Sequence, residues 1–160
     1  MDLQSLIQER LIDIDLQVDT AQDAIRSLGK LLVEAGYVEE GYIEEAVKRE
    51  AQFPTGLPTQ EIGVAIPHTS AEHVLRSAIA VGILLQPVSF GAMGNPGQFV
   101  EARIVFLLAI REPSRQVNSL QQLVALFQNT KTLLGLATAS SPTAAYQLIV
   151  NDLRETARTP

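Results

Sequence analysis

The chain has 160 residues, of which 46% are hydrophobic and 5% aromatic, with a formal net charge of −6 and no cysteine. This length and hydrophobic content predict a globular domain with an aliphatic core. The negative charge argues against nucleic acid and anionic membrane surfaces as partners, because both bind basic proteins. The lack of cysteine excludes disulfides and thiolate metal sites. Without a leader-like N-terminus or a bilayer-length apolar run, we expect a cytoplasmic protein with no direct membrane insertion.

The first third of the chain predicts one strand followed by two helices. Residues 12–18 alternate between apolar and polar, which is typical of a half-buried strand near a sheet edge. A helix capped by Thr20 or the residue before it should follow, and Gly36 is its natural stop. Residues 38–51 have the pattern of a second amphipathic helix, which the prolines of residues 53–58 should end.

The remainder predicts buried strands and then helices. Residues 77–85 and 102–110 are apolar runs, and the second should be a central strand covered on both faces. Pro87 should break the first run and leave a short edge strand at 88–90. The expected fold is therefore α/β (α+β mixed), a single domain over residues 1–160 with a mixed sheet flanked by helices. Helices are expected after residue 113, at 131–137 and at 144–153, and frayed ends are expected at 1–8 and 154–160.

His68 is the strongest candidate for chemistry. It follows the apolar segment 62–66 and Pro67, at the end of a strand where α/β proteins place their sites. Thr69, with Glu72 three residues later, predicts a helix start whose free N–H groups and dipole favour an anion. A neutral imidazole is a competent nucleophile, and these features favour a phosphoryl acceptor over a structural histidine.

Metal and nucleotide sites have little support in the sequence. His73 lies five residues after His68, so the two do not share a helix face as a zinc-binding pair would, and a surface position is expected for it. The glycines at 91, 94 and 97 lie in a loop without a phosphate-binding motif. We therefore expect neither a metal nor a cofactor.

Several residues before His68 are candidates for holding a phosphoryl group. Arg49 closes the second helix; its guanidinium suits a phosphoryl group, although it also suits the helix dipole. Thr55 and Gly56 could offer hydroxyl and backbone donors, although an ordinary turn is the simpler interpretation of the two residues taken alone. Glu61 could orient a ring nitrogen, but a solvated carboxylate is the simpler interpretation.

The order Arg49-Glu50-Ala51, Phe53-Pro54-Thr55-Gly56 and Val64-Ala65-Ile66-Pro67-His68 resembles the A component (EIIA) of the bacterial phosphotransferase system, PTS. The resemblance is to the fructose–mannitol type and its galactitol-like branch, and it extends through residues 104–110 into the leucine-rich helix that follows. The resemblance implies that the sheet is mixed and has five strands.

The resemblance also implies a function. His68 would accept a phosphoryl group from HPr, forming a tele-phosphohistidine, and pass it to a cysteine of an EIIB component that serves an EIIC membrane permease. Arg49 would stabilise the phosphoryl group beside His68, with Thr55, Gly56 and Thr69 in support. The activity would be that of a phosphotransferase acting in sugar uptake.

One position departs from the mannitol and fructose pattern. Those members carry a second histidine at the start of the helix after the central strand, where this chain has Gln116 or, with a slip in placement, Asn118. Glutamine can donate a hydrogen bond but cannot titrate, so any proton-coupled role would be lost. The galactitol-like branch also tends to lack this histidine. The alternative function is that of a regulatory phosphoacceptor of the nitrogen-type EIIA kind, which controls a protein partner.

Overall fold

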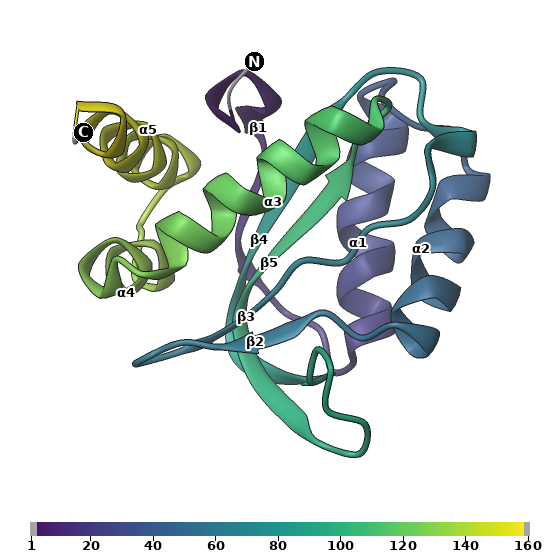
Figure 1. Ribbon diagram of the computed structural model, residues 1–160, viewed down its shortest axis with the longest axis horizontal. Helices are drawn as coiled ribbons and strands as arrows, with labels where there is room; N and C mark the ends of the chain where they lie inside the picture. The colour runs from purple at the N-terminus through teal and green to yellow at the C-terminus, as the bar shows by residue number, and fades with distance from the viewer. Residues whose placement is uncertain (1–2, 159–160) are drawn as a thin grey trace.

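The structure is a computed structural model that describes residues 3–158. A mixed five-stranded sheet in the order β1-β4-β5-β3-β2 forms its centre (Figure 1). The β4–β5 and β2–β3 pairs are antiparallel, whereas β1 runs parallel to β4 and β3 runs parallel to β5. The strands are β1 (Ile7–Leu16), β2 (Gly56–Pro58), β3 (Gly63–Ala65), β4 (Ala78–Gly91) and β5 (Phe99–Ala109).

Helices cover both faces of this sheet. Figure 1 shows α1 and α2 side by side on one face, with α3, α4 and α5 on the other. The helices are α1 (Ala21–Glu34), α2 (Gly41–Gln52), α3 (Pro113–Phe127), α4 (Thr130–Ala137) and α5 (Pro142–Arg158), and two short 3₁₀ turns are η1 (Leu3–Leu6) and η2 (Ala71–His73). The predicted α/β single domain with a mixed sheet is confirmed.

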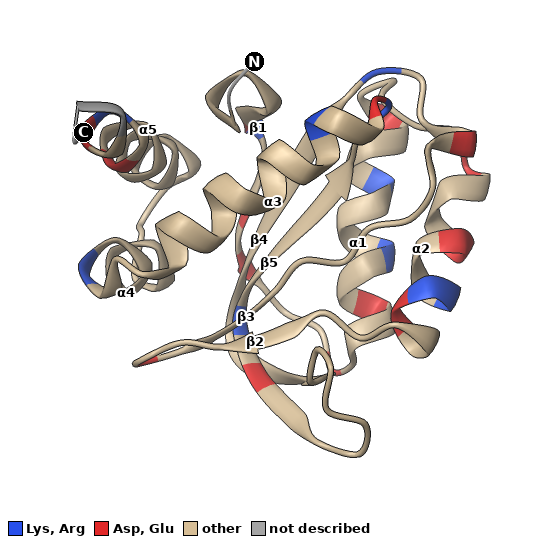
Figure 2. Cartoon of the chain, in the orientation of Figure 1, with Lys and Arg blue, Asp and Glu red and all other residues tan. Residues whose placement is uncertain are grey.

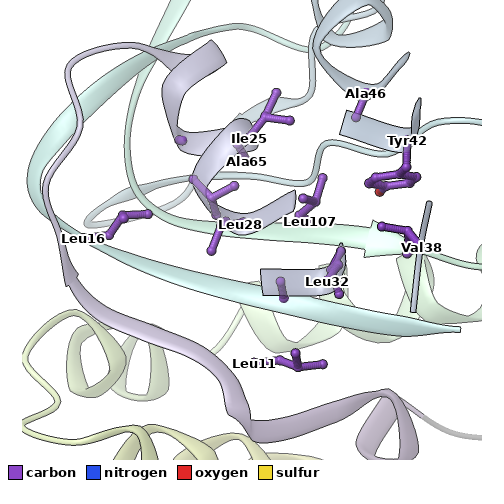
Figure 3. Packing of buried hydrophobic residues seen from close by; sticks show 14 of the residues in the cluster. Leu11, Leu16, Ile25, Leu28, Leu32, Val38, Tyr42, Ala46, Ala65 and Leu107 are labelled. Carbon is purple, nitrogen blue, oxygen red and sulfur yellow. The ribbon is translucent and has the colours of Figure 1, made fainter. Parts of the chain in front are cut away.

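The central strand β5 separates two hydrophobic cores. Leu107 faces the core under α1 and α2, where it lies among Leu28, Leu32 and Tyr42 (Figure 3). Phe106 faces the opposite core, in which strand residues pack against α3, α4 and α5. Alternate residues of an apolar strand therefore each find a packed layer, which explains its continuous hydrophobic run and confirms its predicted central position.

Local signals in the first third of the chain are also confirmed. The Thr20 hydroxyl accepts the Asp23 N–H at 3.1 Å and caps α1. Gly36 follows the helix with φ of +82°, a conformation that favours glycine. Strand β1 lies at the sheet edge, as its alternation indicates. The second helix begins at Gly41 rather than near Val38, because Val38 instead bridges to the strand-like Val74.

The prediction that Pro87 ends its strand was wrong. Strand β4 continues to Gly91, and the pairing with β5 shifts register between Ile83 and Val88. The pairing of β4 with β1 has already ended at Leu84. Pro87 therefore lies beyond one neighbouring strand and beside a bulge in the pairing with the other, so its missing N–H costs no ladder bond.

The ends for which fraying is predicted contain regular secondary structure among the described residues. Leu3 and Leu6 are buried in η1, and β1 begins at Ile7. At the other end, α5 continues to Arg158. Residues 1–2 and 159–160, which belong to the same prediction, lie outside the described residues.

Candidate functional site

The turn Ile66-Pro67-His68, which leaves β3, is held at three points. The Ile66 N–H donates to the Thr55 hydroxyl at 3.2 Å. The Pro67 carbonyl accepts the Leu108 N–H at 3.0 Å, so the turn continues the pairing with β5. Pro67 itself restricts the backbone. The imidazole of His68 therefore projects from a stiff backbone at the end of a buried strand.

The ring of His68 is fixed in one orientation and one tautomer. Nδ1 lies 2.8 Å from the Ile66 carbonyl oxygen. Since a carbonyl oxygen only accepts, Nδ1 carries the hydrogen and Nε2 of the neutral ring keeps its lone pair. Burial lowers the pKa of His68, the hydrogen bond to Ile66 opposes this, and the nearby Arg49 guanidinium lowers the pKa further. The neutral, nucleophilic form is therefore favoured.

Arg49 lies at the end of α2, close enough to His68 for its charge to act on the ring. Its guanidinium stacks on the Phe53 ring with 4.2 Å between the guanidinium carbon and the ring centroid. A cavity of about 350 Å³ beside it is polar and contains Thr69. Its lining consists of Glu45, Lys48, Arg49, Gln52, Thr69 and Ser70. The structure thus places Arg49 and Thr69 on one cavity next to the His68 turn.

The position of α2 relative to the His68 turn is set through β5. The buried Tyr42 of α2 donates its hydroxyl to the Leu108 carbonyl, and burial raises the pKa of Tyr42. The N–H of the same Leu108 donates to Pro67. One residue of the central strand therefore connects the helix that carries Arg49 to the turn that carries His68.

Thr55 and Gly56 do not serve as donors in the way predicted. The N–H and hydroxyl of Thr55 both donate to the buried carboxylate of Glu50, at 2.8 and 2.7 Å. Gly56 pairs with Ala65 in the sheet, and a side chain there would place Cβ only 2.7 Å from the Gly91 carbonyl oxygen. Both residues therefore have structural contacts: Thr55 binds Glu50, and Gly56 pairs in the sheet. Burial raises the pKa of Glu50 to about 7 despite the two bonds from Thr55.

The prediction that a helix begins at Thr69 was wrong. Only the three-residue η2 forms, and its cap Ser70 makes no side-chain hydrogen bond. Val74 is already extended and bridged to Val38, which prevents helix growth. The donors of a full helix N-terminus are therefore absent beside His68 among the described residues.

The residues proposed to replace a second histidine lie in α3. Gln116 lines neither cavity beside His68, and its amide oxygen is buried without a hydrogen-bond partner among the described residues. Asn118 lines a separate cavity between α3 and α5. His73 packs against Gly41, with its Nδ1 3.5 Å from Glu39. None of the three is brought into hydrogen-bond contact with His68 in the described part of the chain.

His68 also lines a groove of about 510 Å³, whose extent the sequence does not delimit. The groove is mostly apolar, and α3 supplies part of its wall. Its lining consists of Leu57, Pro58, Thr59, Gln60, Ile66, His68, Met93, Leu120, Val124, Phe127, Gln128 and Thr130. Arg115 and Lys131 are the only charged residues of α3 and α4 (Figure 2). The sequence feature that could have indicated the groove is the width of the apolar stripe on α3. Leu123 in this stripe is buried, whereas the neighbouring Val124 is 44% exposed.

Among residues 3–158, no group of three or more histidines and acidic residues is placed to hold a metal ion. No helix in this part of the chain is long and apolar enough to cross a membrane.

Comparison with known proteins shows several relatives. The chain is 31% identical over 101 residues to the transcriptional regulator ManR of Bacillus subtilis, which corresponds to 63% of this chain and only 14% of that protein. It is 28% identical over 108 residues to the galactitol-specific EIIA component of Escherichia coli K12, covering 66% of this chain and 70% of the relative.

Solved structures of mannitol EIIA from Escherichia coli are similar over most of the chain. The crystal structure of that protein aligns with a TM-score of 0.72 and 28% identity over 88% of this chain and 96% of the other. The same protein in a complex with phosphorylated EIIB aligns with a TM-score of 0.73 and 25% identity over 91% and 99%.

The family model for the phosphoenolpyruvate-dependent sugar phosphotransferase system, EIIA 2, matches residues 5–152. This segment contains both walls of the site and the whole sheet. The chain belongs to the EIIA 2 family of the sugar phosphotransferase system, whose members mediate phosphoryl transfer.

Proposed function

We propose that this protein is a phosphoryl carrier in which Nε2 of His68 is the acceptor and phosphorylated HPr is the donor. The hydrogen bond from Nδ1 to the Ile66 carbonyl carries the proposal, because it leaves the Nε2 lone pair free in the neutral ring. Nε2 attacks the phosphorus while the P–N bond to the donor histidine breaks, and the donor nitrogen keeps the electron pair. The proton on Nδ1 remains on its bond to Ile66.

Arg49 stabilises the phosphoryl group during this transfer. Its guanidinium is already held on Phe53 next to the His68 turn, so little reorganisation is needed when the negative charge arrives. Thr69 and Ser70 add polar groups on the same wall. The apolar groove on the opposite side offers a surface for the partner proteins.

The next acceptor is a cysteine of a galactitol-like EIIB component, which serves an EIIC permease. The similarity to galactitol-specific EIIA and to a mannitol EIIA solved with phosphorylated EIIB supports this partner. The cysteine thiolate attacks the phosphorus, and the broken P–Nε2 bond returns its electron pair to His68. No metal or nucleotide takes part in either step.

The experiment is phosphorylation by ³²P-labelled HPr. The chain has only two histidines, so His68→Gln and His73→Gln form a matched pair. Wild type and His73→Gln should take up one acid-labile, base-stable phosphate, and His68→Gln should take up none. Labelling of His68→Gln, or no labelling of wild type, would contradict the proposal.

A regulatory function is the second candidate, and the 31% identity to the regulator ManR favours it. The same phosphorylation of His68 would then control a protein partner. Purified galactitol-type EIIB distinguishes the two functions. Transfer of the label to the EIIB cysteine supports sugar uptake, whereas label retained on His68 supports regulation.

A further inference from the structure

The strongest unexplained feature near the site is Glu50, a buried acid one residue after Arg49. It is only 7% exposed and lies at the end of α2. Both of its carboxylate oxygens accept hydrogen bonds, and both donors belong to Thr55. Burying a carboxylate is costly unless it is well bonded, so this arrangement requires an explanation. Nothing in the transfer step proposed above uses it.

The bonds continue from Glu50 to the catalytic ring. The Thr55 hydroxyl gives its hydrogen to Glu50, which turns its lone pairs toward the Ile66 N–H. Ile66 is thereby held at its nitrogen, while its carbonyl accepts the Nδ1–H of His68. Each bond in the series fixes the donor and acceptor roles of the next group.

We propose that Glu50 and Thr55 are positioning residues that fix the ring of His68 in the Nδ1–H tautomer through Ile66. This inference rests on the proposed function of His68. When Glu50 is ionised, its carboxylate can only accept hydrogen bonds, so the Thr55 hydroxyl must be the donor. The oxygen of this hydroxyl then accepts the Ile66 N–H. Ile66 is thereby held so that its carbonyl accepts the Nδ1–H of His68. The geometry therefore leaves Nε2 as the only ring nitrogen free to attack.

The same bonds join the two halves of the site. Glu50 ties the last turn of α2 to Thr55, and Thr55 ties that loop to the strand end before His68. Arg49 is carried on the turn that Glu50 anchors. A misplacement of about 1 Å between a catalytic group and its target reduces rates by up to ~100-fold, so this link matters for transfer.

The test uses three variants that change the bonds and little else. Thr55→Val keeps the shape of the side chain and removes the hydroxyl. Thr55→Ser keeps the hydroxyl, and Glu50→Gln replaces an acceptor oxygen by a donor NH₂ group. Long-range ¹H–¹⁵N spectra of the two histidines report the tautomer of His68 in the unphosphorylated protein, and single-turnover labelling by HPr gives the maximal rate and the half-saturating concentration.

We expect wild-type His68 in the Nδ1–H tautomer and a mixture of tautomers in Thr55→Val and Glu50→Gln. Their maximal rates should fall about tenfold with half-saturating HPr within about twofold of wild type, and Thr55→Ser should restore the rate. A wild-type Nε2–H tautomer overturns the inference even if no variant folds. Folded Thr55→Val or Glu50→Gln with wild-type tautomer and rate also overturns it. If wild type shows the expected tautomer but takes no label, the function of His68 fails instead.

Discussion

The two walls beside His68 differ in chemistry. One wall, at the end of α2, is polar and carries Arg49, Thr69 and Ser70 around a cavity of about 350 Å³. The other wall is the groove of about 510 Å³ between the β2 segment and α3, lined largely by apolar side chains such as Leu120 and Val124. A phosphoryl group needs fixed positive charge and hydrogen-bond donors, whereas a protein partner needs apolar area.

Under the proposed function, charge stabilisation belongs to the cavity lined by Arg49, and partner docking belongs to the groove lined by His68. A change in the polar wall should alter the rate within the complex, and a change in the groove should alter the concentration of partner required. Single-turnover phosphorylation by HPr measures both quantities.

Arg49→Ala should have the largest effect. Removing a pre-organised donor from a developing charge costs about 100-fold or more in rate, so the maximal rate should fall by ~100-fold with half-saturating HPr little changed. Arg49→Lys should recover only part, because lysine lacks the planar fork. Lys30→Ala on α1 removes the same charge at a distance and should behave as wild type. If the maximal rate of Arg49→Ala is within threefold of wild type, Arg49 does not stabilise the phosphoryl group.

Val124→Asp should have the next largest effect. A carboxylate placed on the groove must lose water when a partner covers it, so half-saturating HPr should rise about tenfold, which corresponds to ~1.4 kcal/mol. The maximal rate should stay within twofold. Val117→Asp is a matched control, since Val117 is on the same helix, is 57% exposed and does not line the groove. If the two substitutions raise half-saturating HPr equally, the groove is not the docking surface.

The smallest effect concerns pH. Burial and Arg49 lower the pKa of His68 from its ordinary value of about 6.5, so the neutral nucleophile should persist below that pH. An NMR titration of the His68 ring should have its midpoint below 6.5, and a midpoint at or above 6.5 contradicts the buried ring.

The sign for stability follows from the same shift. The unfolded chain binds this proton more tightly, so the contribution of His68 to the free energy of unfolding should fall as pH drops from about 6.5 through the folded pKa. Urea unfolding of wild type and His68→Gln should therefore diverge in that range, with less loss in the variant.

Much of the frame around His68 was predictable from the sequence. The apolar run of β5 requires cover on both faces, and the Thr20 cap and Gly36 stop are local signals that tertiary contacts did not override. The strand end at Pro67 and the helix end at Arg49 are equally local. The approach of Arg49 to His68 was expected only from the resemblance to EIIA. Leu108 connects the two elements through hydrogen bonds but is distant from both in the sequence, so the local pattern does not reveal the contact.

The errors came from long-range contacts. Thr69 and Glu72 form a capping pattern, but the bridge from Val74 to Val38 holds the chain extended and leaves only η2. Thr55 looked like a phosphoryl donor because nothing in the sequence reveals that Glu50 is buried beneath it. The groove wall on α3 was hidden in a stripe that mixes the buried Leu123 with the exposed Val124.

The central claim is that Nε2 of His68 receives the phosphoryl group while Ile66 holds Nδ1. The most direct test is a ¹⁵N–³¹P correlation on the ¹⁵N-histidine-labelled protein after complete phosphorylation by HPr. We predict a single phosphorus coupled to Nε2 of His68. Phosphorus coupled to Nδ1 of His68 or to either nitrogen of His73, or coupled to no histidine nitrogen, would contradict the claim.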